Sequence, residues 1–305
     1  MKAVVTGGAG FIGTHLVRAL TDSGYEVHVL DNLSSGSTAG LDARAVFHQM
    51  DIRSMEASEI VKQERPDVVF HLAAQADVQH SIRQPWQDAD VNIMGTLRIL
   101  EACREAGCKI VFSSTAGIYG ELQKERIVEE DPTVPISCYG QSKLAAECYI
   151  RLFHHLYGVE YTILRYSNVY GPGQGVKGEG GVVALFMERL VKGEPLQIHG
   201  DGEQTRDFIY VYDVVKANMA AARKASQSTV HVSTGRTSTI NGLASYLLGL
   251  HGRGLTSVHT PAKTGDIRHS CLENTKAGML LGWKPSYSIE KGLRQTYDSW
   301  LNNVG

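Results

Sequence analysis

The sequence TGGAGFIG at residues 6–13 decides the fold, because it joins a predicted strand to a predicted helix. The apolar run Lys2–Thr6 comes before it, and Gly10–Ser23, with apolar side chains at helical spacing, comes after it. Glycines bind a dinucleotide when they occupy such a strand-to-helix turn. The stretch therefore predicts the start of a nucleotide-binding α/β domain, and a plain tight turn is the alternative.

The three spaced glycines of this turn have separate tasks. Gly7 allows the tight turn, Gly10 lets backbone approach a pyrophosphate, and Gly13 lets the helix pack close to the strand. Their spacing is G-x-x-G-x-x-G, not the G-x-G-x-x-G of the larger dehydrogenases. The helix N-terminus adds unpaired N–H groups and a partial positive charge that favour phosphates.

Asp31 indicates which dinucleotide is bound. It follows the second predicted strand, Val27–Leu30, and lies at the strand end where dinucleotide folds place an acidic residue. A carboxylate there accepts hydrogen bonds from both ribose hydroxyls and repels a 2′-phosphate. We therefore expect NAD rather than NADP, with a simple cap as the alternative role for Asp31.

Short β-branched runs alternate with helix-length segments from residue 2 to about residue 170. This alternation predicts βαβ units, a parallel sheet covered on both faces and a doubly wound α/β (Rossmann) fold. Asp90–Ala106 is one of the helices that we expect, ending before Gly107. The further predicted strands are Ala45–His48, Val68–Leu72, Lys109–Ser113 and Tyr161–Arg165.

The composition changes after Gly171. Residues 171–181 hold six glycines, so we expect a loop over a ligand site, with a plain connector as the alternative. We assign 1–170 to an NAD-binding Rossmann domain, to which later segments are free to return, and 171–305 mainly to a smaller C-terminal α/β substrate lobe. The elements expected there are the helices Val182–Lys192, Tyr212–Lys224 and Ile289–Asn302 and the strands Leu196–His199 and Val230–Ser233.

Composition excludes several classes of protein. The chain has 305 residues, 43% of them hydrophobic, and a formal net charge of −2, so it can bury a full core and has no overall positive field for nucleic acid or an anionic membrane. It has no apolar run long enough to span a membrane, and a strand that begins by Ala3 leaves no room for a signal peptide. The five cysteines lack zinc-like spacing, so we expect reduced thiols, no metal and a cytoplasmic location.

Tyr139 and Lys143 form the candidate acid–base pair. Their i,i+4 spacing puts the phenol and the ammonium on one face of a predicted helix. A phenol titrates near a pKa of about 10 and needs a nearby cation to act as a base near neutrality. Ser113 and Thr115 end a predicted strand at the sheet edge where ligands bind. A solvated helix face and strand-end caps are the structural alternatives.

Together these residues resemble the extended short-chain dehydrogenase/reductase superfamily, and within it the UDP-glucose 4-epimerase-like branch that acts on sugar nucleotides. The resemblance extends over nearly the whole chain, in nine ordered motifs. These are TGGAGFIG (6–13), DNLSSG (31–36), DI (51–52), HLAAQ (71–75), FSSTAGIYG (112–120), YGQSK (139–143), LRYSNVYGPGQ (164–174), GDGEQTRDFIYV (200–211) and TGDIRHS (264–270).

The resemblance implies a full set of contacts to NAD. Phe11 and Ile12 would cap the pyrophosphate, and the adenosine side, the adenine and the middle of the cofactor would each have their own group of residues. The adenosine ribose side would be held by Asp31, Asn32, Ser35 and Gly36, and adenine would be bracketed by Asp51 and Ile52. The middle of the cofactor would be lined by Leu72, Ala73, Ala74 and Gln75. Ser113, Tyr139 and Lys143 would flank the nicotinamide.

It also implies a UDP-sugar substrate and a mechanism. Asn168 would contact the diphosphate, Arg206 would bind phosphate, and His199 would lie beside uracil. Tyr139 as phenolate would take the proton of the sugar 4-hydroxyl, helped by Lys143, while C4 gives hydride to NAD. Thr115 would relay or orient that proton. The 4-keto sugar would then turn over and take the hydride back on its other face.

Several positions depart from the family pattern. Ala116 and Gly117 replace the acidic pair of the dTDP-glucose 4,6-dehydratases, which disfavours a dehydratase. Lys263 stands where epimerases often carry an arginine for the diphosphate; Arg268 compensates for it, or Lys263 is a surface residue. Ser270 occupies the position that limits the sugar pocket, and a serine leaves volume for the 2-acetamido group of UDP-GlcNAc or UDP-GalNAc. Packing is the alternative reason for its size.

Two other readings remain open. One is a different enzyme of the same superfamily, a UDP-glucuronate epimerase or decarboxylase, which would need a cation beside C5. The sequence does not assign that role to Arg83, Lys177 or Arg206. The other is a non-catalytic NAD-binding relative, which the presence of Tyr139 and Lys143 disfavours. The family also implies a homodimer formed through a four-helix bundle, here from helices near 90–106 and 140–157.

Overall fold

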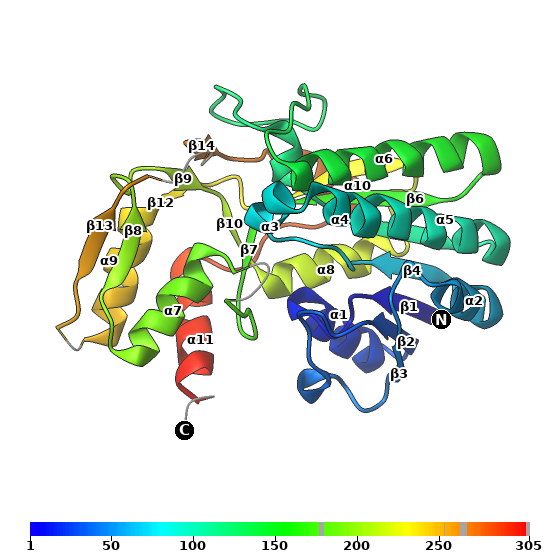
Figure 1. Cartoon of the computed structure of the whole chain (residues 1–305), viewed down its shortest axis with the longest axis horizontal. Helices are drawn as coiled ribbons and strands as arrows, with labels where there is room; N and C mark the ends of the chain where they lie inside the picture. The colour runs from blue at the N-terminus through cyan, green and yellow to red at the C-terminus, as the bar shows by residue number, and fades with distance from the viewer. Residues whose placement is uncertain (177–179, 253, 263–266, 303–305) are drawn as a thin grey trace.

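The structure is a computed structural model that describes residues 1–176, 180–252, 254–262 and 267–302. Its larger part is built on one sheet, and a smaller lobe lies beyond the carboxyl ends of the strands (Figure 1). None of the described helices is long and apolar enough to cross a membrane.

The central sheet has seven strands, and every neighbouring pair is parallel. From one edge to the other the strands are β11 (Ser228–Val232), β6 (Tyr161–Tyr166), β5 (Lys109–Thr115), β4 (Val68–His71), β1 (Lys2–Thr6), β2 (Glu26–Asp31) and β3 (Val46–Gln49). The chain runs outward from β1 to β3 and starts again on the other side at β4. Connections leave β1 and β4 in opposite directions, and a crevice forms at their carboxyl ends. The doubly wound fold is confirmed.

Helices cover both faces of the sheet because the strands are apolar on both faces. Along β1, Ala3 and Val5 pack into one buried cluster and Val4 into the other. The helices of the first face are α1 (Phe11–Asp22), α8 (Val211–Ala221) and α10 (Thr275–Leu281), and those of the second are α2 (Met55–Glu64), α5 (Gly95–Ala106) and α6 (Cys138–Tyr157).

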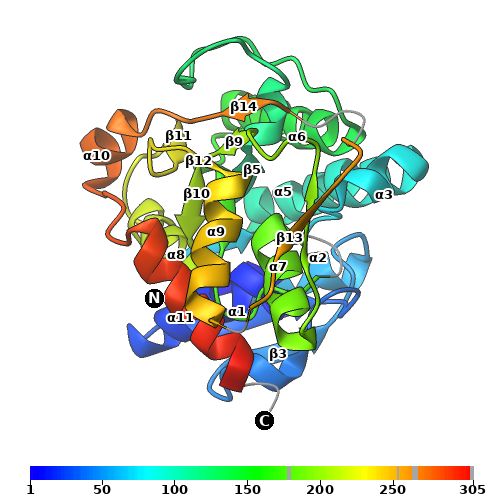
Figure 2. The same ribbon diagram turned by 90° about the vertical axis from the view of Figure 1, so that its left-hand side faces the viewer.

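Residues after Gly171 contribute both to the lobe and to the large sheet. Strand β11 pairs with β6, and α8 packs against α1, so the later half of the chain completes the central sheet and the helical layer on its first face. In the lobe, α7, α9 and α11 pack on one another (Figure 2). The lobe elements are β7 (Asn168–Tyr170), α7 (Val182–Lys192), β8 (Leu196–His199), β9 (Thr205–Arg206), β10 (Phe208–Tyr210), β12 (Ser238–Thr239), α9 (Ile240–His251), β13 (Ser257–Thr260), β14 (His269–Ser270) and α11 (Ile289–Asn302).

Two predicted helices have different limits in the structure. Asp90–Ala106 is divided into a π-helical turn, η2 (Asp90–Met94), and α5, and the Asn92 side chain within the turn donates to the Gln75 carbonyl oxygen at 2.9 Å and to the Ser142 hydroxyl at 3.0 Å. The helix predicted to reach Lys224 ends at Ala221. The Lys109 ammonium donates hydrogen bonds to the carbonyl oxygens of Ala221 and Lys224, at 2.7 and 2.8 Å. The remaining short elements are η1 (Thr38–Gly40), α3 (Val78–Arg83), α4 (Pro85–Ala89) and η3 (Ala116–Tyr119).

A buried ion pair ties α6 to the centre of the sheet. Glu147 of α6 is fully buried and accepts two hydrogen bonds from the Arg165 guanidinium of β6, at 2.9 and 2.7 Å. The same carboxylate accepts a hydrogen bond from the Ser114 hydroxyl of β5 at 2.6 Å. Burial disfavours the ionised carboxyl, but Arg165, the Ser114 hydroxyl and Arg151 together outweigh burial and lower the pKa of Glu147.

Glu147→Ala should therefore be strongly destabilising. It leaves the Arg165 guanidinium buried without its counter-ion, which costs about 3–5 kcal/mol of unfolding free energy. Urea unfolding followed by circular dichroism measures this loss. Glu59→Ala is the matched control, because Glu59 of α2 is exposed and lies 3.2 Å from Lys62, and its loss should cost below about 0.5 kcal/mol. Equal stability of the two variants would contradict the assigned role of Glu147.

Candidate active site

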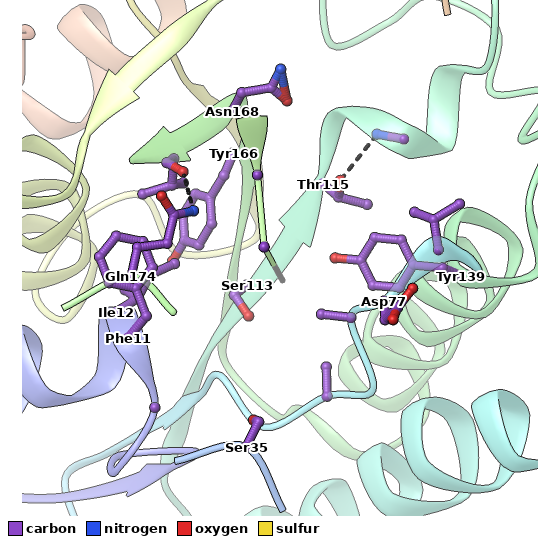
Figure 3. Close-up of a pocket in the computed structure, with 18 of the residues that line it drawn as sticks. Phe11, Ile12, Ser35, Asp77, Ser113, Thr115, Tyr139, Tyr166, Asn168 and Gln174 are labelled. Atoms are coloured by element: carbon purple, nitrogen blue, oxygen red, sulfur yellow. Dashed lines mark hydrogen bonds between the residues drawn. The ribbon is translucent and has the colours of Figure 1, made fainter. Parts of the chain in front are cut away.

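A cavity of about 850 Å³ lies between the carboxyl ends of the sheet and the lobe. Figure 3 shows side chains from both parts around it, including Phe11, Tyr139 and Asn168. The predicted cofactor and substrate residues that line it are Gly7, Gly10, Phe11, Ile12, Gly13, Asp31, Asn32, Ser35, Asp51, Ile52, Leu72, Ala73, Ala74, Ser113, Thr115, Tyr139, Lys143, Asn168, His199, Arg206 and Ser270.

The glycine turn leaves room for a pyrophosphate against bare backbone. Gly7 has φ +69° and donates its N–H to the Leu30 carbonyl oxygen at 2.8 Å. A Cβ on Gly13 would lie 2.2 Å from the Gly7 carbonyl oxygen, so only glycine lets α1 approach the turn this closely. The N-terminus of α1 therefore faces the cavity, as a phosphate site requires.

Asp31 is held in place at the end of β2. One carboxylate oxygen accepts the Ala9 N–H at 3.0 Å, and the other accepts the Leu33 N–H at 2.8 Å. Each oxygen keeps a lone pair, and the side chain lines the cavity, so the carboxylate can accept the ribose hydroxyls of NAD. Asp51, at the end of β3, is paired with Arg53, whose hydrogen bonds hold the pKa of Asp51 well below its usual range.

A neutral histidine that sequence reasoning missed supports the middle of the cavity wall. His71 ends β4, and burial lowers its pKa to about 3. The Thr96 hydroxyl donates its proton to the Asn92 carbonyl oxygen. The Thr96 hydroxyl oxygen must therefore accept a hydrogen bond from His71 Nε2–H, at 3.0 Å. His71 Nδ1 then accepts from the Thr6 hydroxyl at 2.7 Å, and Thr6 accepts the Ala73 N–H at 3.2 Å. The sequence feature that could have pointed to His71 is a polar residue inside an apolar predicted strand.

The first turn of α6 fixes the acid–base pair. The Ser81 hydroxyl oxygen of α3 accepts the Tyr139 N–H at 3.1 Å, and Ser142 donates to the Tyr139 carbonyl oxygen at 3.0 Å. Lys143 is buried and donates to the Ser113 carbonyl oxygen at 2.9 Å, with its ammonium 4.7 Å from the centre of the Phe112 ring. Figure 3 shows the Tyr139 hydroxyl pointing into the cavity, on the side of Ser113 and Thr115.

The hydroxyls of Ser113 and Thr115, both on β5, make different hydrogen bonds. Ser113 donates its proton to the His71 carbonyl oxygen at 3.1 Å. Thr115 accepts the Gly117 N–H at 3.0 Å, which orients the hydroxyl and leaves its proton for a ligand. Thr115 is therefore the better placed of the two to donate a hydrogen bond into the cavity.

The lobe brings together the residues expected to hold the second ligand. Strand β9 carries Arg206 beside Ser270 of β14 in parallel register, and β7 carries Asn168. His199 ends β8, and its Nδ1 lies 2.8 Å from the Thr260 hydroxyl. Of the glycine-rich segment 171–181, the described residues form no helix or strand, and Gln174, Gly180 and Gly181 line the cavity.

Among the described residues, three predicted site residues are not part of the cavity wall. Arg268 makes a two-point ion pair with Asp201 at 2.7 and 2.8 Å instead of facing the cavity. Gln75 turns its side chain to Asp88 and to the backbone of Asp77, and Gly36 packs against Ala9. Lys263 lies outside the described residues.

The chain belongs to the NAD dependent epimerase/dehydratase family, whose model matches residues 3–234. The glycine turn, Asp31 and the cavity wall fit the NAD that this family uses. NAD provides a hydride acceptor that can also return the hydride. The membership confirms the predicted resemblance and the cofactor, and relatives named UDP-glucose 4-epimerase confirm the NAD-dependent isomerase class.

Relatives of the chain are named for the epimerisation of UDP-sugars. A UDP-glucose 4-epimerase solved with UDP-glucose from Thermotoga maritima has a TM-score of 0.97 and 45% identity, covering 100% of both chains. A putative UDP-glucose 4-epimerase of Methanocaldococcus jannaschii is 40% identical over 98% of each chain. A UDP-glucuronic acid 4-epimerase of Bacillus cereus, solved with UDP-glucuronic acid and NAD, has a TM-score of 0.92 and 31% identity over 99% of this chain and 100% of the other.

Gly13→Ala should abolish the retention of NAD. The added Cβ must push α1 away from the Gly7 carbonyl oxygen, and the N–H groups at the helix start then lose their position on the pyrophosphate. NAD released from the purified, acid-precipitated protein measures its occupancy. Gly40→Ala is the control, because its Cβ would meet nothing closer than Thr14 at 3.9 Å. Full NAD occupancy in Gly13→Ala would contradict the placement of the pyrophosphate.

Proposed function

We propose that the chain interconverts UDP-glucose and UDP-galactose by inverting C4 of the sugar. The observation that carries the proposal is one continuous cavity. It is lined by the glycine turn and Asp31 from the N-terminal half of the sheet, by Asn168, His199 and Arg206 from the lobe, and by Tyr139 from α6. Such a cavity can hold NAD and a UDP-sugar with both reactive groups beside the phenol.

Tyr139 is the base and then the acid of the reaction. Its phenolate takes the proton of the sugar 4-hydroxyl as the hydride leaves C4, and later returns that proton to the alcohol of the product. Lys143 lies one helical turn away and favours the phenolate through its positive charge. Thr115, oriented by Gly117, donates to the oxygen on C4 while the proton moves.

Inversion requires the 4-keto sugar to turn between the two hydride transfers. We propose that Asn168 and Arg206 hold the diphosphate during this step, so that rotation about the phosphate links presents the other face of the ring. A cavity of about 850 Å³ leaves space for this movement. The small Ser270 in its wall also leaves room for a 2-acetamido group, so we extend the proposed substrates to UDP-GlcNAc and UDP-GalNAc. A non-catalytic role is disfavoured, because Tyr139 and Lys143 both line the cavity.

Tyr139→Phe should abolish turnover and leave the fold and bound NAD intact. Removing a general acid–base lowers kcat by about 10²–10⁴-fold. The measurement is conversion of UDP-galactose to UDP-glucose by chromatography, with NAD occupancy determined in parallel. Tyr157→Phe is the matched control at the exposed end of the same helix and should retain wild-type rates. Unchanged turnover in Tyr139→Phe would refute the assigned role.

We further propose that two copies associate through a four-helix bundle of α5 and α6, and that the enzyme works in the cytoplasm. Tyr149, Leu152 and Leu156 of α6 are 38%, 44% and 55% exposed and lie at helical spacing, so they form an apolar stripe. Met94, just before α5, is a further exposed apolar side chain, with 54% of its surface exposed. Unpaired cysteines at all five positions suit a reducing compartment.

Leu152→Glu should convert the proposed dimer to a monomer, because it puts an unpaired charge in the middle of the apolar interface. Light scattering coupled to gel filtration gives the mass directly. Met279→Glu is the control, since Met279 is 78% exposed on α10, away from the stripe, and its variant should remain dimeric. A monomeric wild-type protein, or a dimeric Leu152→Glu variant, would contradict the bundle.

A further inference from the structure

Asp77 places a negative charge in the cavity wall near Tyr139. It lines the cavity at the N-terminus of α3, where one of its oxygens accepts the His80 N–H at 2.9 Å. One turn later in α3, Ser81 contacts the Tyr139 N–H. Figure 3 shows the Asp77 carboxylate beside the Tyr139 ring, and both side chains line the cavity.

Hydrogen bonds to the Asp77 backbone hold this residue in place, in addition to the helix cap that its side chain forms. The Gln75 side chain accepts the Asp77 N–H at 2.7 Å and donates to the Asp77 carbonyl oxygen at 3.1 Å. Gln75 is fixed in turn by a hydrogen bond of 2.8 Å to the buried carboxylate of Asp88. The carboxylate of Asp77 is therefore a positioned charge rather than one carried on a mobile loop.

Two of the three Lys and Arg side chains in the described cavity wall lie away from Tyr139. Arg189 donates to Gln197 at 2.7 Å in the lobe, and Arg206 lies on β9, also in the lobe. Lys143 is close to Tyr139 and is committed to the Ser113 carbonyl oxygen and to the chemistry. Arg83 does not line the cavity, and Lys177 lies outside the described residues. Within the described wall, none of these side chains except Lys143 brings a positive charge to the Tyr139 end, where Asp77 brings a negative one.

We propose that Asp77 is a specificity-determining residue that excludes UDP-sugars with a carboxylate on C5, such as UDP-glucuronate, in favour of neutral hexoses. The inference rests on the proposed function, because Tyr139 locates C4 and C5 is bonded to C4. Two carboxylates held close together in a partly enclosed site repel each other strongly. A hydroxymethyl group on C5, as in glucose and galactose, carries no charge and meets no such repulsion.

Asp77→Asn isolates the charge. Asparagine has nearly the same shape as aspartate and is an equally good helix N-cap, so α3 keeps its start. The measured quantity is the ratio of kcat/KM for UDP-glucuronate to kcat/KM for UDP-glucose, with the NAD-loaded protein. The ratio should rise by about 10- to 100-fold, the effect of removing one nearby like charge. Asp77→Ser keeps a capping oxygen without the charge and should act in the same direction.

Glu188→Gln is the matched control, because it removes a carboxylate from the lobe side of the same cavity. It should leave the ratio unchanged within about twofold, since added distance and solvent weaken the repulsion. A ratio that stays at the wild-type value in both Asp77→Asn and Asp77→Ser would overturn the proposal. So would an equal rise in Glu188→Gln, because the effect would then be general to the cavity.

A binding measurement on the unmodified chain gives a second, independent test. Wild-type protein should bind the neutral methyl ester of UDP-glucuronate at least about 10-fold more tightly than UDP-glucuronate itself. In Asp77→Asn this preference should disappear, as a double-mutant cycle requires for a direct interaction. Equal affinities in the wild type would overturn the proposal even if the variants failed to fold. Failure of the wild type to epimerise UDP-glucose would instead refute the proposed function and leave the binding comparison intact.

Discussion

The docking of helix α6 onto strand β5 is the constraint on which the site depends. Lys143 binds the Ser113 carbonyl oxygen, and Glu147, one turn later, binds the Ser114 hydroxyl. These two contacts fix the helix that carries Tyr139 against the strand that carries Thr115. Arg165 of β6, the next strand of the sheet, donates two hydrogen bonds to the same Glu147 carboxylate. The helix, the strand and the side chains that we propose to react therefore form one rigid unit.

The cofactor side of the cavity depends on a different restriction, the absence of side chains. Gly13 lets α1 touch the Gly7 carbonyl, and a Cβ on Gly7 would lie 2.7 Å from the Ala73 N–H nitrogen. The neutral His71 then links Thr6 and Thr96 through hydrogen bonds and holds the strand ends that face the cavity. The two sides of the cavity are thus built by opposite means, one by close backbone approach and the other by buried polar contacts.

Sequence alone was sufficient for the doubly wound fold, and it singled out the glycine turn and Tyr139 and Lys143, which line one cavity, because each pattern depends on local spacing. It failed where the outcome depends on partners far apart in the chain. Arg268 pairs with Asp201, and no local pattern could reveal that choice. The π-helical turn at Asn92 also follows from tertiary contacts, since the Asn92 side chain bonds to Ser142 and to the backbone of Gln75. Asp77 was overlooked because its carboxylate reads as an ordinary helix cap until the cavity wall is seen.

The most direct test of C4 inversion within one site uses UDP-glucose carrying deuterium on C4. If hydride leaves and returns to the same carbon inside a closed cavity, the UDP-galactose formed must keep the deuterium on C4, with the proton of its 4-hydroxyl supplied through Tyr139. NMR of the product in ordinary water reads this directly. Full retention of the label with inversion at C4 is the predicted result. Loss of the label to solvent, or product with C4 not inverted, would contradict it.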